Sequence, residues 1–426
     1  MTGLYLIVGF FALVFIGVPI GASIGLVSVG YLLQAMGIDG ITIFASRLFT
    51  GSNSYELMAI PLFVLAGDLL YEGKISKTLV NLANSLVGSV TGGMAMVTTL
   101  ACQFFGAVSG SGPATTAAVG AVVAKDMEED GYPRDFTAAT IAASGPLGVL
   151  IPPSILAVVY GCTTGVSIGK LLVAGIGPGI AYGTVMFVYE YYTSKKNGYG
   201  TKKQFSLTAV FKALKESMLA LMIPVIILGG IYSGLFTPTE AACVSVVYAF
   251  IIGMFIYKSI SWRTLPRIFK GSAVTAATIM FITGNIALLS WVLTRERIPE
   301  TLASMALSYV GTPIMYILVS NVILLFAGMV ESGSSTIILL APLMHPIAVA
   351  FGIDPVFYGA MTVANLAIGM ITPPVAATLY VAQRVCDVSI TDLIRRIWPY
   401  FFVQLIALLI CILVPNIFMF LPSLLG

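Results

Sequence analysis

Long apolar segments, separated by short polar connections, follow one another along almost the whole chain. A bilayer crossing needs about 20 apolar residues, so the pattern predicts on the order of ten to twelve membrane helices. Two of them, roughly 217–234 and 239–257, are joined by a short turn and form a predicted helical hairpin. A polar, lysine-containing stretch at 194–216 separates a first half, 1–193, from a second half, 217–426. We therefore expect an all-α polytopic membrane protein in two parts.

Both halves carry breaks in their apolar segments, and the breaks repeat in register. The repeated residues are 221 positions apart (332 − 111 and 373 − 152): Ser111–Gly112 with Ser332–Gly333, and Pro152–Pro153 with Pro373–Pro374. Small residues also let membrane helices pack closely, which is the alternative interpretation of any single break. Four breaks in two registered pairs favour a site, because broken helices at corresponding positions of two halves mark the binding site of a secondary transporter.

Composition agrees with a membrane location. Hydrophobic residues make up 58% of the chain and charged residues 9%, whereas soluble domains carry roughly 25% charged residues. The apolar start, from Leu4 onward, has no basic flank and is expected to be a first membrane helix rather than a removed signal. The five cysteines are scattered and form no CxxC pair, which gives no sign of metal or redox chemistry.

Basic residues give a predicted orientation. The lysine-rich stretch 195–215 is expected on the cytoplasmic side, because loops on that side carry an excess of Lys and Arg. The connection after the first Ser-Gly break contains Lys125 and Arg134, whereas the matching stretch 346–355 contains neither Lys nor Arg. The two repeats are therefore predicted to be inverted, the arrangement in which one site faces the two sides of the membrane in turn.

The breaks supply oxygen atoms rather than titratable groups. Carbonyls freed by a broken helix, with neighbouring Ser and Thr hydroxyls, are ligands suited to a small cation such as Na⁺, and the N-termini of half-helices attract anions. His345 is the one histidine and 136–169 holds no charged residue, so sodium is favoured over a proton relay. Glu331 directly precedes the second break, where a place in the substrate cavity and a structural role both stay open. Arg295 is either an interfacial anchor or a ligand for a substrate carboxylate.

Five motifs, in this order, resemble those of a known family. They are IPLFVLAG at 60–67, SGSGPATTAAVG at 109–120, GPLGVLIPPS at 145–154, GMVESGSSTIILLAP at 328–342 and ITPPVAATLYV at 371–381. Over essentially the whole chain, the sequence resembles the large membrane subunit of TRAP transporters, which are tripartite, ATP-independent uptake systems for organic acids in the bacterial inner membrane. The resemblance implies a Na⁺-coupled importer of the elevator type. It also implies two re-entrant helical hairpins, whose tips fall near 109–116 and 331–336.

The resemblance further places ligands residue by residue. It implies two groups of Na⁺ ligands: Ser109, Ser111, Gly112, Gly145 and Gly148 in the first, and Ser332, Gly333, Ser335, Asn365, Gly369 and Thr372 in the second. The substrate would lie between the tips, near Ser109, Ser154 and Glu331. Arg295 is a further candidate for holding its carboxylate. An acid at 331 accepts hydrogen bonds, which favours a polyhydroxylated acid such as a sialic acid over a plain C4-dicarboxylate.

Two partners follow from the same resemblance. One is a small four-helix membrane subunit, expected here as a separate polypeptide, and the other is a periplasmic binding protein that captures the substrate first. A self-sufficient Na⁺/dicarboxylate symporter of related architecture, which needs neither partner, stays open as an alternative. A membrane-embedded enzyme is a third class, but one histidine and few buried acids argue against it, so no catalytic residue is expected.

Overall fold

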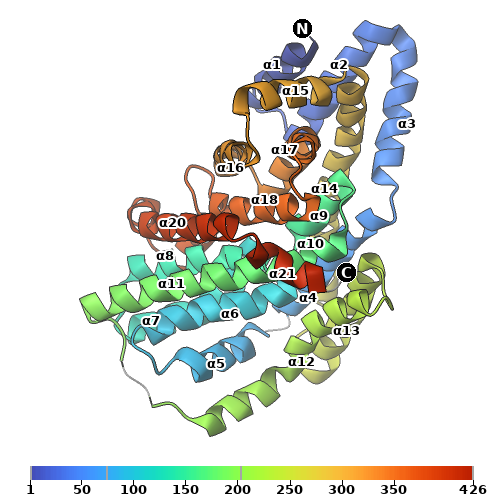
Figure 1. Ribbon diagram of the computed structural model, residues 1–426. Coiled ribbons are helices and arrows are strands. Elements are labelled where there is room, and N and C mark those ends of the chain that lie inside the picture. The colour runs from blue at the N-terminus through green and yellow to red at the C-terminus, as the bar shows by residue number, and fades with distance from the viewer. Residues whose placement is uncertain (1, 73–74, 202–203, 425–426) are drawn as a thin grey trace.

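A computed structural model describes residues 2–72, 75–201 and 204–424, and every regular element within these ranges is a helix (Figure 1). This confirms the all-α fold expected from the apolar pattern. The helices of the first half are α1 (Thr2–Phe15), α2 (Ile20–Met36), α3 (Gly40–Ser52), α4 (Ala59–Glu72), α5 (Ser76–Val87), α6 (Gly93–Ser109), α7 (Gly112–Glu129), α8 (Arg134–Ser144), α9 (Ile155–Thr164), α10 (Ile168–Ala174) and α11 (Ile176–Asn197).

The second half begins after a polar connection. Its helices are α12 (Leu207–Tyr232), α13 (Pro238–Ile251), α14 (Leu265–Arg295), α15 (Ile298–Val310), α16 (Pro313–Val330), α17 (Gly333–Ala350), α18 (Pro355–Gly369), α19 (Ala377–Cys386), α20 (Ile390–Leu413) and α21 (Asn416–Leu424). Short 3₁₀ and π segments accompany them: η1 (Gly37–Asp39), η2 (Glu56–Met58), η3 (Gly145–Val149) and the π-helix η4 (Ile252–Ile256). Because α11 ends at Asn197 and α12 begins at Leu207, helices occupy both ends of the polar 194–216 stretch.

Eight helical segments among the described residues are long and apolar enough to cross a membrane. They are Ile20–Ser52, Ile168–Asn197, Leu207–Tyr232, Pro238–Ile256, Leu265–Arg295, Pro313–Val330, Gly333–Ala350 and Ile390–Leu413. Three further apolar helices, α6, α9 and α18, are shorter, with 17, 10 and 15 residues. The count is lower than the ten to twelve crossings expected from the sequence, because part of the apolar sequence forms short helices that end at breaks.

The helix boundaries reproduce the 221-residue repeat. The corresponding boundaries are the ends of α6 and α16 at Ser109 and Val330, and the starts of α7 and α17 at Gly112 and Gly333 (333 − 112 = 221). α7 and α17 both contain 18 residues. Pro152–Pro153 and Pro373–Pro374 both have cis peptide bonds. The two halves therefore share one local architecture around their breaks.

Serine caps build both Ser-Gly breaks. Gly110 ends α6 with a φ of 66°, a left-handed conformation that glycine adopts without steric cost. Ser111 then caps α7, because its Oγ accepts a hydrogen bond from the Ala114 N–H at 3.5 Å. In the second repeat, Ser332 caps α17 by accepting from the Ser335 N–H at 3.3 Å. The small, hydroxyl-bearing motifs thus end one helix and start the next.

Outer helices surround these broken helices. In Figure 1, α12 and α13 lie side by side at one end of the molecule, away from α1 and α15 at the other end. α13 also packs against α4. α14, with 31 residues the longest helix in the described part of the chain, packs against α2, α3 and α4 as well as α17. It therefore connects the outer helices to the second broken pair.

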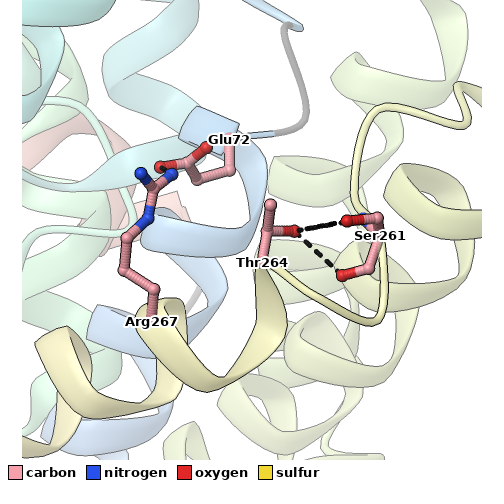
Figure 2. Close-up of polar contacts among 4 residues, drawn as sticks. All are labelled: Glu72, Ser261, Thr264 and Arg267. Carbon is pink, nitrogen blue, oxygen red and sulfur yellow. Dashed lines mark hydrogen bonds and ion pairs between the residues drawn. The ribbon is translucent and has the colours of Figure 1, made fainter.

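Two polar contacts join α4 to α14. Arg267 Nη2 lies 2.6 Å from Glu72 Oε1, beside the hydrogen-bonded turn 261–264 that precedes α14 (Figure 2). Further along α14, Ser272 Oγ donates to Asp68 Oδ2 at 2.5 Å. Both helices go on to line the cavity described below, so these contacts hold two of its walls together.

Arg267→Ala is expected to lower the free energy of unfolding by no more than about 1 kcal/mol. The arginine side chain is 70% exposed, and exposed ion pairs contribute little because water already solvates both charges. The thermal unfolding midpoint of the purified protein in detergent measures this, with Arg263→Ala as a charge-matched control from the preceding turn. A loss of several kcal/mol in the Arg267 variant alone would contradict the expectation.

Candidate functional site

The first break is closed against the segment that follows the first Pro-Pro pair. The Gly110 carbonyl accepts a hydrogen bond from the Ile155 N–H at 3.3 Å. A side chain at Gly110 would overlap the Pro153 carbonyl, so only glycine fits this approach. Ser154 then caps α9, since its Oγ accepts from the Ala157 N–H at 3.2 Å. The first Ser-Gly break and the first Pro-Pro break therefore form one unit.

Most residues of the first predicted sodium site are neighbours. A side chain at Gly145 would approach the Gly112 carbonyl oxygen to 3.1 Å, and one at Gly148 would approach the Ser111 carbonyl oxygen to the same distance. Behind them, Ser109 Oγ lies 2.9 Å from the hydroxyl of Thr115. Carbonyl and hydroxyl oxygens of α7 thus gather against η3, and oxygen ligands of this kind suit a hard cation.

The second break packs in a similar way against α18. Gly369 lies against the backbone of Gly328, where any side chain would come within 2.9 Å of three backbone atoms. Asn365, one turn earlier on the same face of α18, donates from Nδ2 to both the backbone and the side-chain oxygen of Asn321, at 2.9 and 2.8 Å. At the tip, Ser332 Oγ lies 2.8 Å from Ser335 Oγ.

Two of the buried oxygens that have no hydrogen-bond partner among the described residues belong to the second predicted sodium site and its neighbour in α17. They are Asn365 Oδ1 and Thr336 Oγ1, whose residues are each 1% exposed. An orphaned polar atom in a buried place costs about 1–3 kcal/mol unless something binds it. Thr336 is the repeat counterpart of Thr115 (336 − 115 = 221), which sits in the first group of oxygens. Each of these two oxygens therefore has the chemistry of a cation ligand.

One cavity of about 380 Å³ lies between the two breaks. Its lining includes both tips, at 110–113 and 330–334, and residues of α4 and α14. The first residues of four helices also line it: Gly112 of α7, Ile155 of α9, Gly333 of α17 and Ala377 of α19. A helix N-terminus carries partial positive charge and unpaired N–H groups, so this arrangement favours an anion.

The two repeats contribute to each other's walls. A side chain at Gly112 would come within 2.9 Å of Met370 Sδ, which belongs to the second repeat. A side chain at Gly333 would come within 3.0 Å of Leu156, which belongs to the first repeat, and within 3.4 Å of the Met370 methyl group. Met370 thus touches both tip glycines, and the tips face each other across one shared space.

Of the four residues predicted to contact substrate, the structure brings one to the cavity. Glu331 lines it. Ser109 and Ser154 are each 2% exposed, outside the lining, and engaged in helix-end hydrogen bonds. Arg295 stacks over the Trp291 ring, 5.4 Å from its centroid. It lies 16 residues, or about 24 Å of helix, beyond the cavity-lining Ile279.

The predicted sodium ligands divide in the same manner. Those that line the cavity are Ser111, Gly112, Ser332 and Gly333. Those that lie behind the tips are Ser109, Gly145, Gly148, Ser335, Asn365, Gly369 and Thr372. In this second group, the Thr372 hydroxyl donates to the Ile368 carbonyl, four residues earlier, at 2.7 Å. Four of the eleven predicted sodium ligands therefore line the cavity, and seven do not.

Sequence reasoning missed several residues of the site. Asn321 accepts the hydrogen bonds of Asn365, and Thr336 carries a buried oxygen without a partner; the signal of each was a polar residue within an apolar helix. Thr275 of α14 lines the cavity, but nothing local in the sequence marks it. Met370 follows Gly369, where its apolar character is that of an ordinary packing residue.

Comparison with known proteins adds a family. A model of the family described as "Tripartite ATP-independent periplasmic transporter, DctM component" matches residues 7–417. The chain is 38% identical over 429 residues to the C4-dicarboxylate TRAP transporter large permease protein DctM of Rhodobacter capsulatus, with 97% of each chain covered. It is 37% identical over 418 residues to the sialic acid TRAP transporter large permease protein SiaM of Vibrio cholerae, with 98% of each covered. It is 40% identical over 414 residues to the isethionate TRAP transporter permease protein DctMQ of Oleidesulfovibrio alaskensis, covering 97% of this chain and 65% of that protein.

A solved structure shares the fold. The crystal structure of the Alcanivorax borkumensis YdaH transporter matches with a TM-score of 0.62 and 16% sequence identity, over 88% of this chain and 89% of that chain. At this level of identity the similarity concerns the arrangement of helices alone.

Proposed function

This chain belongs to the DctM family of tripartite ATP-independent periplasmic (TRAP) transporters, and we propose that it uses a sodium gradient to import a small organic acid. It is a large permease subunit, a multi-pass protein of the inner membrane. Because this family consists of transporters, transport is favoured over the membrane-embedded enzyme considered from the sequence. Membership of the family leaves open which ion drives transport, which acid is transported and which conformational change carries it across the membrane.

The cavity between the two tips carries the proposal. The first residues of four helices line a space of about 380 Å³, which is within the usual range of small-molecule sites. Its lining is otherwise largely apolar, with hydroxyls of Ser111, Ser332 and Ser334 at the tips. An acid group held by N–H donors and hydroxyls, with its remaining atoms against apolar walls, is the ligand that this chemistry favours.

Oxygen atoms at and beside the two tips form the proposed sodium sites. The first consists of carbonyls and hydroxyls around Ser111, Gly112 and Thr115, and the second includes the orphaned oxygens of Thr336 and Asn365. Bound sodium would neutralise the carbonyl dipoles beneath each tip and hold the helix N-termini in their cavity-facing positions. Ion binding and substrate binding are then coupled through the same two breaks.

The substrate class is an organic anion. The three relatives compared above are named for C4-dicarboxylate, sialic acid and isethionate, all of which are anions. In this chain Glu331 adds a negative charge to the cavity. A carboxylate accepts hydrogen bonds from hydroxyl or amide groups and repels a second acid group, so we propose a singly charged, hydroxylated acid of the sialic acid type over a C4-dicarboxylate.

Glu331→Gln is expected to change the choice of substrate. Removing the charge should strengthen inhibition of uptake by a plain dicarboxylate about fivefold, which corresponds to about 1 kcal/mol. Inhibition by a sialic acid should weaken, because glutamine is the poorer hydrogen-bond acceptor. Competition for uptake in proteoliposomes measures both ratios. Glu300→Gln on the exposed face of α15 is the control, and equal shifts in the two variants would contradict a role for Glu331 in the cavity.

Two partners complete the proposed transporter: a small membrane subunit and a periplasmic binding protein. The family description names a tripartite system, and the DctMQ relative extends beyond the part matched by this chain. Reconstitution tests the proposal: uptake of labelled acid is measured under an imposed sodium gradient with this chain alone, with the small subunit, and with both partners. Uptake only with both supports it. Full uptake by this chain alone would identify the self-sufficient symporter instead.

We also propose inverted repeats and an elevator-type movement. The charge difference between the Lys125–Arg134 connection and the matching stretch 346–355 supports the inversion. The shared cavity supports the movement, because two tips that complete each other's walls are best carried across the membrane as one body. Cross-linking of α14 to α17, which pack together here, tests it: a cross-link that blocks uptake without blocking substrate binding is the expected result.

A further inference from the structure

A fully buried acid lies behind the first break, at a place that the proposed function does not use. Glu190 of α11 is 0% exposed. Its Oε1 lies 2.6 Å from the hydroxyl of Thr99, and that hydroxyl lies 2.9 Å from the hydroxyl of Ser144. Ser144 Oγ in turn lies 2.8 Å from the carbonyl oxygen of Thr140. These contacts form one chain of three hydrogen bonds that passes through Ser144, the residue before Gly145, and ends at the Thr140 carbonyl.

The number of hydrogens in this chain favours a protonated Glu190. Three hydrogen bonds need three hydrogens, and each hydroxyl supplies one. If Glu190 is ionised, Thr99 donates to it and Ser144 donates to Thr99, so the contact between Ser144 and the Thr140 carbonyl has no hydrogen. If Glu190 is protonated, Glu190 donates to Thr99, Thr99 donates to Ser144, and Ser144 donates to Thr140. The neutral acid completes all three bonds.

The surroundings of Glu190 agree with this count. The titratable groups that face it are Cys102 of α6, Tyr132 before α8, Tyr189 of its own helix and Tyr400 of α20, all neutral at ordinary pH. Arg396 of α20 contacts Asp135 instead, at 3.5 Å. Glu190 Oε2 has no hydrogen-bond partner among the described residues. An ionised carboxylate buried without a cation is strongly disfavoured, whereas a neutral acid is tolerated.

We propose that Glu190 is a proton-binding site and that its proton positions Ser144 beside the first sodium site. Ser144 ends α8 and is followed by Gly145, which lies against the Gly112 carbonyl of the first tip. Loss of the proton frees the Ser144 hydroxyl from the Thr140 carbonyl and loosens the end of α8 at that point. Glu190 thereby acts through Ser144, without touching ion or substrate. The coupling of Glu190 to sodium binding rests on the proposed function, whereas the protonation of Glu190 does not.

Infrared spectroscopy of the purified protein tests the proton directly. The wild-type protein at neutral pH should show the C=O stretch of a protonated carboxyl that is missing from Glu190→Gln, whose amide donates to Thr99 in the same geometry. Glu331→Gln is the control and should keep the band. A spectrum in which Glu190→Gln removes a carboxylate band instead overturns the proposal.

Sodium-dependent uptake tests the positioning role. The half-saturating sodium concentration of the wild type should rise about fivefold as the pH is raised far enough to ionise Glu190, the effect of one lost hydrogen bond. It should not vary with pH in Glu190→Gln. Thr99→Val, which interrupts the chain, should raise it at every pH. If the half-saturating sodium concentration of the wild type varies with pH as little as that of Glu190→Gln, the proposal that Glu190 positions Ser144 is overturned. If uptake by the wild type does not depend on sodium at all, the proposed function is contradicted. The infrared spectrum would still show whether Glu190 carries a proton.

Discussion

Gly112→Val and Gly333→Val are each expected to reduce sodium-dependent uptake by at least about tenfold while leaving membrane insertion intact. A first side-chain carbon at Gly112 already comes within 2.9 Å of Met370 Sδ, and one at Gly333 comes within 3.0 Å of Leu156. Valine adds two further carbons, so the Met370 and Leu156 side chains must shift, and the tip moves by whatever overlap they do not relieve. Because the glycine begins the helix whose N-terminus faces the cavity, that movement displaces the N–H groups proposed to bind the acid. Uptake of labelled substrate in proteoliposomes measures the loss.

Gly271→Val is the matched control. Gly271 lies in α14 with nothing within 4 Å of the position that a side chain would occupy, so the same substitution there is expected to leave uptake within about twofold of the wild type. The milder changes Ser111→Ala and Ser332→Ala, which remove the caps, should lower uptake less than the valines do. Unchanged uptake and unchanged sodium dependence in all four tip variants would contradict the assignment of the site to the two tips.

Thr336→Val is expected to raise the half-saturating sodium concentration about tenfold or more without lowering stability. The Thr336 hydroxyl is buried and has no hydrogen-bond partner among the described residues, so its removal costs no protein hydrogen bond. Valine keeps the shape of threonine. If the hydroxyl binds sodium, the variant loses a ligand to a charged group, which is worth roughly 1.5–3 kcal/mol. Sodium titration of uptake, beside a thermal unfolding curve, separates the two effects.

Thr362→Val provides the comparison for this variant. Thr362 is buried in α18, and its hydroxyl donates to the Tyr358 carbonyl at 2.8 Å within the same helix. Removing that local bond is expected to leave the sodium titration unchanged. Equal sodium affinity in Thr336→Val and the wild type would show that the orphaned oxygen is not an ion ligand.

The all-α fold and the positions of the breaks could be predicted from the sequence. Glycine and proline act locally, so the 221-residue shift in the sequence reappears as a shift in helix ends at Gly112 and Gly333. The number of membrane crossings was predicted less accurately. Hydropathy counts apolar residues and does not separate a spanning helix from a short one that ends at a break, such as α6 with 17 residues.

The individual contacts of the site depended on long-range geometry. Ser109 and Ser154 are polar residues at breaks, but they lie at helix ends, where their hydroxyls form hydrogen bonds instead of lining the cavity. Arg295 belongs to α14, and its distance from the cavity follows from the length of that helix rather than from its neighbours in sequence. Glu190 stands five residues before Lys195, which suggests a solvated helix end. The spacing of Gly179, Gly183 and Glu190 places the acid on the packed face of α11 instead.

The exchange of wall residues between repeats has a consequence for the origin of this protein. Gly112 of the first repeat meets Met370 of the second, and Gly333 of the second meets Leu156 of the first, so neither half encloses the cavity by itself. A single-repeat ancestor would have built the same space only as a pair of chains, each lending its partner a wall. Joining such a pair into one polypeptide would leave the two tips free to differ, as Gly110 and Glu331 do at corresponding positions.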